Sequence, residues 1–457
     1  MTLRPREDES AGVSAKGGTL EPTKQVEEAQ RRQDRWSWVD PEVWTERMLA
    51  ALEAGVKGGK WYSLMDKVYA ERTLRAAWER VRRNGGSAGV DRQSVEAFAA
   101  RAEQYLAELA GELRAGTYQP QAVRRAWIPK PGRAERRPLG IPVVKDRIVQ
   151  GALKLVLEPI FEAEFAEGSY GFRPERGCKD ALRRVDERLK GGNHWVVDVD
   201  LKSYFDTIPH EALLREVERK VTDGRVLGLL RAYLSQRVLD GLEQWQPEAG
   251  SPQGAVVSPL LANVYLDPLD RLMAEQGYRM VRYADDMVVL CGSQDEADAA
   301  LGTLGEWVTA HGLALHPEKT RIVDASQRGG FDFLGYHFER GQRRPSQRNE
   351  RKLKTTIRAR TRRTSGVSLA TTIAELNLLL RGWFAYFKHS HWTTFERLDG
   401  WIRMRLRSIL RKRRGGQGRG RGADHQRWPN AYFVKHGLFT MTTARCQAVR
   451  ALAVQPR

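Results

Sequence analysis

Long apolar runs are missing from this chain, and so are clustered cysteines and an excess of acidic residues. A membrane-spanning helix needs about 20 predominantly apolar residues, and no segment of the sequence approaches that length. Residues 1–33 are polar and charged and have no apolar core of the kind found in secretory signals. We therefore expect no membrane association and a cytoplasmic location.

Cysteine is scarce. Cys178, Cys291 and Cys446 lie far apart in the sequence and form no CxxC pair. Structural zinc sites and disulfide frameworks both need clustered cysteines, so the sequence predicts no structural zinc and no disulfide framework. Isolated thiols are typical of a protein from a reducing cytoplasm.

Basic residues, by contrast, are abundant. The 76 lysines and arginines outnumber the 57 acidic residues, which gives a formal net charge of +19. A polyanionic partner explains such a charge, because the neutralisation of phosphates releases counterions and drives association. Charge alone leaves open a basic protein with no nucleic-acid role. A membrane surface is the weaker explanation, since the sequence supplies no apolar anchor.

Local patterns predict an α+β chain. Apolar residues at helical spacing indicate helices between Trp36 and about Arg83. Four prolines and two glycines between Trp127 and Pro142 indicate an extended hairpin. Two β-rich segments, residues 195–200 and 280–291, predict strands, and the second is interrupted by a tight turn at Ala284-Asp-Asp286.

Capping residues predict two further helices. One begins at Ser258-Pro259 and ends at Gly277, and the other begins at the capping box of Ser293 and Glu296 and ends near Gly312. Residues 341–350 are polar and indicate a boundary, residues 351–413 are helical and basic, and residues 411–422 are of low complexity and expected to be flexible.

Carboxylates stand at the ends of the predicted strands. Asp200 closes the first strand, and Asp285 and Asp286 occupy the turn of the second. Neighbouring strands lie about 4.8 Å apart, so these side chains can bracket two Mg²⁺ ions about 3.5–4 Å apart, as two-metal phosphoryl transfer requires. The alternative for an isolated Asp-Asp pair is that it only forms a turn.

Tyr283-Ala-Asp-Asp286 resembles the palm signature of reverse transcriptases, and it is accompanied by other motifs in the order of that family. The resemblance spans roughly residues 40–340 and has seven ordered motifs. The segments that carry it, besides 283–286, are 87–91, 138–147, 171–182, 200–206, 250–263, 316–320 and 333–335. Segment 380–387 is similar to the hallmark of the group II intron maturase domain. The chain is thus identified as a member of the bacterial group II intron-encoded reverse transcriptase/maturases, of the type without an endonuclease, because clustered Cys and His are missing.

The resemblance implies a right-hand polymerase of the α+β class, with helical fingers, an antiparallel-sheet palm and a helical thumb. Its expected organisation is a disordered tail (1–35), fingers with an amino-terminal extension (36–190), a palm with part of the fingers interleaved (191–345), a thumb or maturase domain (346–412) and a basic tail (413–457).

The resemblance also implies residue roles at the polymerase site. Asp200, Asp285 and Asp286 would bind two Mg²⁺ ions, with Mn²⁺ as a possible substitute, and Lys319 would be the general acid for pyrophosphate unless it is a solvated surface lysine. The residues expected to bind the dNTP are Lys130, Arg137 (with Arg136 as a competitor), Phe205 and Gln253. Those expected to position template and primer are Arg173, Pro252 and Gly254.

Phe205 is the argument for DNA synthesis, because a ring beneath the incoming sugar would collide with a ribose 2′-hydroxyl. The alternative for Phe205 is a core residue that follows a strand.

Intron RNA is the partner implied for the basic thumb, and its expected contacts are Lys352, Lys354, Arg358, Arg362 and Arg363. A charge run of this kind is otherwise a solvated surface. The other expected partners are an RNA template with a DNA primer, a DNA target and dNTPs. Two rival functions stay open: a CRISPR-associated or defence reverse transcriptase, and an RNA-binding splicing cofactor without polymerase activity.

Overall fold

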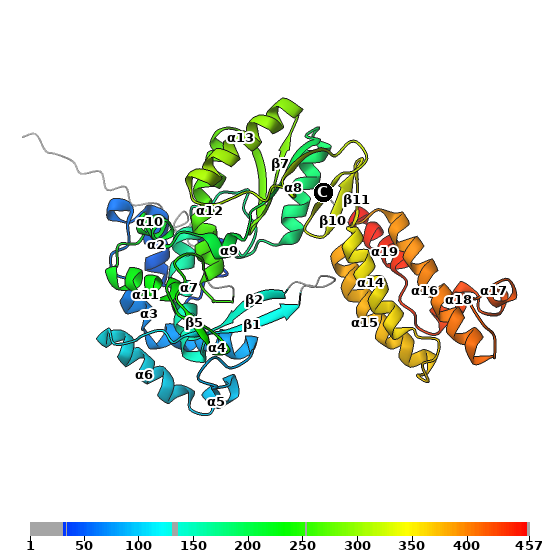
Figure 1. Cartoon of the computed structure of the whole chain (residues 1–457), viewed down its shortest axis with the longest axis horizontal. Coiled ribbons are helices and arrows are strands. Elements are labelled where there is room, and N and C mark those ends of the chain that lie inside the picture. Colours follow the sequence, from blue (N-terminus) through cyan, green and yellow to red (C-terminus); the bar gives the residue numbers. More distant parts are fainter. Residues whose placement is uncertain (1–30, 33, 130–135, 252–253, 455–457) are drawn as a thin grey trace, which may run out of the picture. The chain divides into compact units, whose positions relative to one another are not determined.

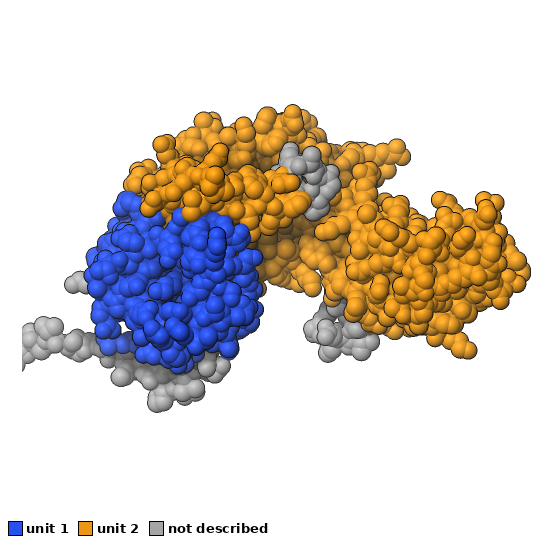
Figure 2. Space-filling model, turned by 60° about the horizontal axis from the view of Figure 1, so that its bottom comes forward, with its two compact units in different colours: residues 1–124, 141–163, 218–232 blue, residues 125–140, 164–217, 233–457 orange. Residues whose placement is uncertain are grey.

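The computed structural model describes residues 31–32, 34–129, 136–251 and 254–454 (Figure 1). The chain divides into two compact units, and each consists of segments that are separate in the sequence (Figure 2). Unit 1 contains residues 1–124, 141–163 and 218–232, and unit 2 contains residues 125–140, 164–217 and 233–457. The expected division sets fingers (36–190) before a palm (191–345) that has part of the fingers interleaved. In the structure the inserted segment is residues 218–232, and residues 125–140 and 164–190 belong to unit 2.

Most of the expected disordered tail, residues 1–30 and 33, lies outside the described residues. Its end is not disordered: residues 31, 32, 34 and 35 are helical, and Arg32 forms an ion pair of 2.7 Å with Glu53.

Unit 1 is helical, as predicted for residues 36–83. Helix α4 buries Leu74, Ala77, Trp78 and Val81, which recur at three- and four-residue spacing. It packs on α7, where a Cβ on Gly151 would lie 3.2 Å from that of Ala77. The helices of unit 1 are α2 (Glu46–Ala54), α3 (Met65–Val68), α4 (Glu71–Asn84), α5 (Val95–Ala99), α6 (Ala102–Ala115), α7 (Val144–Glu162) and α11 (Gly224–Leu234). Helix α11 extends two residues beyond the unit, and a 3-10 turn, η1 (Lys57–Gly59), follows α2.

Asp223 joins the inserted segment 218–232 to the rest of unit 1. Its carboxylate accepts hydrogen bonds of 2.8 Å from the backbone N–H groups of Leu64 and Met65, at the start of α3. The other oxygen accepts from the N–H groups of Arg225 and Val226, at the start of α11. One side chain thus caps two helix ends that are about 160 residues apart in the chain, and the four hydrogen bonds lower the pKa of Asp223 despite its burial.

Unit 2 contains the predicted palm sheet. Its strands are antiparallel in the order β6-β7-β3-β8, with the bounds β6 (Arg279–Tyr283), β7 (Asp286–Cys291), β3 (Trp195–Asp200) and β8 (Arg321–Asp324). Helix α13 (Gln294–Ala310) packs against β3, β7 and β8, and α12 (Ser258–Glu275) packs against α13 and β6. The strands predicted at residues 195–200 and 280–291 are therefore confirmed.

The predicted helix starts are close to the observed ones. Ser293 accepts the N–H of Glu296 at 3.1 Å, as a cap does, while the Glu296 carboxylate accepts from Gly292 instead of Ser293. In α12 the cap position is Val257, and Ser258 is already helical with Pro259 in the first turn.

The described residues form two further sheets, one of four strands and one of three. The predicted hairpin is present as β1 (Val123–Pro129) and β2 (Arg136–Ile141), and it is extended by β4 (Val238–Asp240) and β5 (Glu243–Trp245), which were not predicted. A further sheet consists of β9 (Phe331–Phe333), β10 (Tyr336–Glu339) and β11 (Gln342–Pro345). Strand β11 ends and the first thumb helix begins at residue 347, both within residues 341–350, the segment expected as a boundary. Short helices α9 (Tyr204–Thr207) and α10 (His210–Glu218) follow β3, and α8 (Cys178–Lys190) precedes it.

The predicted helical thumb is present, but the expected basic tail is part of it. Helices α14 (Gln347–Arg360), α15 (Leu369–Phe387) and α16 (Trp392–Arg413) share one apolar core with α17 (Ala423–Arg427), α18 (Asn430–Lys435) and α19 (Met441–Val454) or the turns beside them. Trp428, Phe433, Leu438 and Met441 are all buried in that core. The tail was missed because the glycine-arginine run at 414–422 masks the apolar residues behind it.

The aromatic residues at the end of α15 connect this helical region to the palm. Phe387 belongs to the palm core, with its ring centroid 5.0 Å from that of Tyr336, whereas Trp383 packs on both cores. The Tyr386 hydroxyl donates to the backbone oxygen of Leu334, and the Tyr336 hydroxyl donates to that of Tyr386, each at 2.7 Å. The aromatic residues Trp383, Tyr386 and Phe387 were predicted to form the core of a helix bundle. The prediction is partly correct for Trp383, which packs on both cores, and wrong for Tyr386 and Phe387, which pack in the palm core.

Candidate polymerase site

The register of the palm sheet brings the predicted carboxylates together. Asp200 lies directly opposite Asp286 in the β3–β7 pair, and Asp285 stands in the turn that joins β6 to β7. Since side chains alternate along a strand, Asp198, Asp200 and Asp286 lie on one face of the sheet. Further along the same face, Val196, Val288 and Leu290 pack in the core that α8 covers. One end of the face is thus apolar and the other end is acidic.

The acidic end is electrostatically strained. Loss of hydration, followed by the charges of Asp285, Asp200 and Asp198, raises the pKa of Asp286 to about 6. Loss of hydration also raises the pKa of Asp198 to about 6, although Arg321 opposes the shift. The pKa of Asp285 is raised by burial, although the charge of Arg137 lowers it. A bound cation would relieve this repulsion, and carboxylate oxygens are ligands that suit Mg²⁺.

No set of three or more His, Cys, Asp and Glu side chains is arranged as metal ligands within the part of the chain that the structure describes. A lysine contacts Asp200 instead. The Nζ atom of Lys319 lies 2.9 and 3.1 Å from the two Asp200 oxygens. The donor set fits a divalent cation chemically, and metal binding would require the Lys319 amine to release Asp200.

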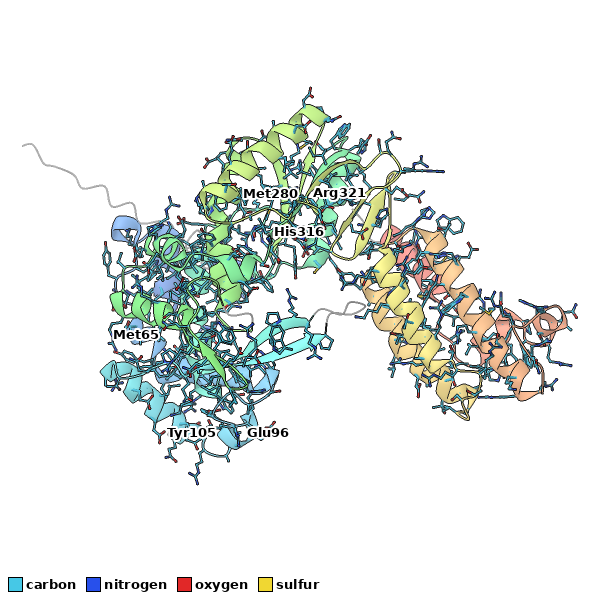
Figure 3. All side chains as sticks on the ribbon, viewed as in Figure 1. Met65, Glu96, Tyr105, Met280, His316 and Arg321 are labelled. Carbon is cyan, nitrogen blue, oxygen red and sulfur yellow. The ribbon has the colours of Figure 1, made fainter. Side chains whose placement is uncertain are left out.

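The loop between α13 and β8 carries Lys319 to this position. The backbone N–H of His316 donates to the backbone oxygen of Asp200 at 2.8 Å, and the backbone N–H of Thr320 donates to the backbone oxygen of His316. Arg321, which follows, lies 3.4 Å from Asp198 (Figure 3 labels His316 and Arg321). The motif at residues 316–320, together with Arg321 of β8, therefore acts as a brace that holds two cations, Lys319 and Arg321, against the two carboxylates of β3.

Gly171 packs closely against the turn that carries Ala284, Asp285 and Asp286. A Cβ at this position would lie 2.2 Å from the backbone nitrogen of Ala284, so a larger residue would displace the turn. Ala284 itself has a φ of 59°, an uncommon conformation for a residue with a side chain. The close approach of residue 171 and the hydrogen bond of 2.8 Å from Asn263 to the Gly171 oxygen hold that conformation.

A buried ion pair that the sequence analysis missed holds the same turn. Arg282 is 0% exposed and donates to both oxygens of Asp270, whose side chain is 2% exposed. Its remaining nitrogen donates to the Asn263 side chain at 3.0 Å and to the Ala284 oxygen at 2.9 Å. The signal for it was a second arginine within the short strand β6, together with an aspartate among the buried positions of α12.

Phe205 lies in α9, directly after the carboxylate strand, and is half-buried. Its backbone oxygen accepts the N–H of Ser251 at 2.7 Å. Gly250 has a φ of 92°, and a Cβ there would lie 2.9 Å from the Asp206 backbone, so this glycine is required for the contact. Gly254 is required in the same way, because its Cβ would lie 2.3 Å from the Gly140 oxygen in β2.

Three of the predicted residues, Lys130, Pro252 and Gln253, lie outside the described residues. Arg173, which is predicted to position template and primer, is buried. It is 7% exposed, its guanidinium donates to the backbone oxygens of Ala166 and Ser169, and it lies over the Phe165 ring. In the structure it orders the loop before the Gly171 motif.

The predicted RNA-binding residues mostly lie on the surface of the thumb. Lys352, Arg358, Arg362 and Arg363 are exposed. Lys354 is half-buried and forms an ion pair of 2.5 Å with Glu350. The cationic groups of Lys354, Arg358 and Arg405 lie 5.6–5.9 Å from the ring of Trp401, which makes a cation-rich aromatic surface.

The fold and the carboxylate turn define the class of protein as a right-hand polymerase, and comparisons with known proteins extend this conclusion. Residues 128–338 match the family model described as reverse transcriptase (RNA-dependent DNA polymerase), and residues 350–428 match the group II intron maturase-specific domain.

Three relatives illustrate the similarity. Protein YkfC of Escherichia coli is 30% identical over 77% of this chain and 98% of its own length. The group II intron-encoded protein LtrA of Lactococcus lactis is 36% identical over 41% of this chain, a match that covers 31% of LtrA. Nuclear intron maturase 2 of Arabidopsis thaliana is 31% identical over 42% of this chain and 31% of its own length.

The chain therefore belongs to the group II intron reverse transcriptase/maturase family. It is an RNA-directed DNA polymerase that carries a maturase-specific domain. Among the described helices, none combines the length and apolar character needed to cross a membrane.

Proposed function

We propose that Asp200, Asp285 and Asp286 catalyse RNA-templated extension of a DNA primer by a two-metal mechanism. The observation that carries this proposal is the register of β3 and β7, which sets Asp200 opposite Asp286 beside the Asp285 turn. In the reaction the primer 3′-hydroxyl loses its proton to solvent, and its oxygen bonds to the α-phosphorus of a dNTP. The bond from that phosphorus to the bridging oxygen breaks, and pyrophosphate leaves.

Two Mg²⁺ ions, or Mn²⁺ in their place, would activate the 3′-hydroxyl and neutralise the charge on the leaving pyrophosphate. The three carboxylates would hold them. Lys319 is the candidate acid: its Nζ already lies at Asp200 and would transfer a proton to the departing pyrophosphate oxygen. Its place on the brace at residues 316–320 keeps that proton near the reacting atoms.

The dNTP would contact three further elements. Lys130 and Arg137 of the β1–β2 hairpin are proposed to bind the triphosphate, since arginine suits bidentate phosphate contacts and lysine acts as a point charge. The influence of Arg137 on the pKa of Asp285 supports its nearness to the site. Gln253 would lie under the templating pair, and Pro252 and Gly254 would position template and primer.

Phe205 is proposed to select the deoxyribose sugar. Its replacement by alanine should lower the preference for dTTP over UTP by about 10²-fold, because a pocket that excludes a hydroxyl by shape contributes about that much discrimination. The measurement is the ratio of kcat/KM for the two nucleotides on an RNA template. Phe205→Tyr is the matched control, since it keeps the ring and should keep the preference. An unchanged ratio in the alanine variant would show that Phe205 is only a core residue.

Binding of a group II intron RNA by the thumb is the second part of the proposal, and DNA would be the target of integration. The maturase-specific domain and the exposed cations of α14 support it. Phosphate contacts dominate such binding and make it salt-dependent.

The double variant Arg362→Gln/Arg363→Gln tests this part. It should weaken intron RNA binding and lower the salt slope of the association constant by about 2, near one unit per lost phosphate contact. Splicing of the intron precursor at limiting protein should fall, while extension of a short primer–template should persist. Arg184→Gln/Arg188→Gln removes the same charge from α8 and should leave splicing intact. Equal splicing in both variants would contradict an intron-binding thumb.

A further inference from the structure

A cavity of about 510 Å³ lies away from the catalytic carboxylates, within unit 2. It is formed by α8, by the β10–β11 hairpin, by the end of α15 and by α19. Its volume is within the range of ordinary ligand sites. We call it the α8–α19 pocket.

Cations dominate the described residues that line the α8–α19 pocket. They are Lys179, Arg183, Arg343, Lys388 and Arg445, accompanied by His389 and by a single carboxylate, Asp186. These cations come from separate segments of the chain, so their convergence is a product of the fold and not of one charged run. Mutual repulsion makes such a cluster costly unless an anion is bound.

The one carboxylate does not neutralise the cluster. Asp186 is 2.7 Å from Lys190, which lies outside the pocket lining, and 3.9 Å from Arg343. Arg183 has an exposed partner, Asp180, at 3.1 Å. Lys179, Lys388 and Arg445 form no ion pair with a described carboxylate. At least three positive charges are therefore available to a ligand.

His389 responds to the excess of positive charge. Its pKa is lowered first by burial and then by Arg343, Lys388, Lys179 and Arg183, so four of the five lining cations act on it in the same direction. The Tyr336 and Tyr386 hydroxyls already donate to backbone oxygens. The donors that remain for a ligand are accordingly the cationic side chains.

A second cavity on α8 provides a contrast within the same molecule. Its lining includes Arg184 and Arg188, but also the carboxylates Glu167, Asp270 and Glu275. Opposite charges are mixed there, whereas the α8–α19 pocket carries five cations against one acid. The two faces of α8 thus differ in electrostatic character although each contributes two basic residues.

We propose that the α8–α19 pocket binds the phosphodiester backbone of a nucleic-acid strand, and that RNA is its ligand in this protein. The proposal deepens the proposed binding of RNA and rests on it. Lysines supply point charges to phosphate oxygens, and the arginine forks of Arg183 and Arg445 suit bidentate contacts. The apolar part of the lining, Leu182, Ala448 and Val449, can lie against a sugar. Because α19 contributes Arg445, the carboxyl-terminal helix is part of this site.

The test is the salt dependence of binding by the full chain to oligo(U) and to oligo(dT) of the same length. For single strands, each phosphate contact contributes about 0.7 to the slope of log K against log salt concentration. Lys179→Gln/Arg183→Gln should therefore lower the slope by about 1.4. The matched control, Arg184→Gln/Arg188→Gln, removes two charges from the other face of α8 and should keep the wild-type slope. Lys179→Arg/Arg183→Lys keeps both charges and should also keep it.

A loss of slope with oligo(U) alone identifies RNA as the ligand, and an equal loss with oligo(dT) supports the backbone contact but overturns the choice of RNA. If the pocket variant and its control have equal slopes, the α8–α19 pocket does not bind a nucleic-acid strand. That result overturns the proposal, even if an acidic polypeptide binds the pocket. A wild type that binds neither strand overturns the proposed RNA binding itself, so the two failures are distinguishable. Unchanged thermal midpoints show that the variants are folded.

Discussion

Replacement of Arg282 by leucine is expected to lower the free energy of unfolding by about 3–5 kcal/mol, because it leaves the buried Asp270 carboxylate without its partner. Arg282 is fully buried and donates to Asp270, Asn263 and the Ala284 oxygen. Its loss removes the hydrogen bond to the Ala284 turn together with the ion pair. Urea unfolding followed by tryptophan fluorescence measures the effect, and primer extension should fall with it because Ala284 precedes the proposed catalytic pair.

A neighbouring arginine on the same strand is the matched control. Arg279 pairs with Glu296 at 2.9 Å, but these side chains are 39% and 30% exposed. A pair at that exposure contributes about 0–1 kcal/mol, so Arg279→Gln should have a small effect. The double variant Arg282→Leu/Asp270→Leu should recover part of the loss, since it leaves no unpaired charge. If Arg282→Leu is no worse than Arg279→Gln, the buried pair does not hold the turn.

Asp285→Asn is expected to lower the rate of primer extension by at least about 10³-fold. The substitution keeps the shape of the side chain and removes one of the three carboxylate charges that are proposed to hold the metal ions. Metal ions stabilise a transition state of this kind by several kcal/mol, and each 1.36 kcal/mol is a factor of ten in rate. Folding should persist, because burial and the neighbouring carboxylates already oppose the charge of Asp285.

Single-turnover extension with saturating Mg²⁺ and dNTP measures the chemical step for this variant. Asp298→Asn, on the exposed side of α13, loses the same charge outside the site and should extend primers at the wild-type rate. Splicing of a bound intron RNA should be retained in both variants, since RNA binding is assigned to other surfaces. Extension by Asp285→Asn at the rate of the control would place the catalytic carboxylates elsewhere.

The parts of the fold that were predictable are those in which local pattern and tertiary role agree. The strands at residues 195–200 and 280–291 alternate or are continuously apolar, and the Ala284-Asp-Asp286 turn interrupts the second. Helices α12 and α13 carry proline or a capping serine at their starts. In these segments the local sequence favours the same secondary structure that the folded chain adopts.

What the sequence did not reveal depends on contacts between distant segments. The Arg282–Asp270 pair joins a strand to a helix, and Arg173 was assigned to nucleic acid because burial cannot be read from an isolated arginine. Asp223 places residues 218–232 in unit 1, a connection that no local pattern encodes. The α8–α19 pocket likewise requires four elements to converge.

The aromatic motif at residues 383–387 illustrates the same limit. Helical spacing predicted that its rings pack within the thumb, yet Phe387 and Tyr386 pack on Tyr336 of the palm. Periodicity identifies the buried face of a helix but not the partner of that face. The segment that is the hallmark of the maturase domain is thus also the connection between the two cores of unit 2.

The most direct test of the central claim is extension of an oligo(dT) primer on a poly(rA) template by the wild-type protein, with dTTP and Mg²⁺ and with UTP in a parallel reaction. The account predicts extension with dTTP, little extension with UTP, and none when the metal is chelated. A folded protein that binds the RNA template but extends no primer would contradict RNA-directed DNA synthesis at this site. RNA binding in support of splicing would then be the function that the structure supports.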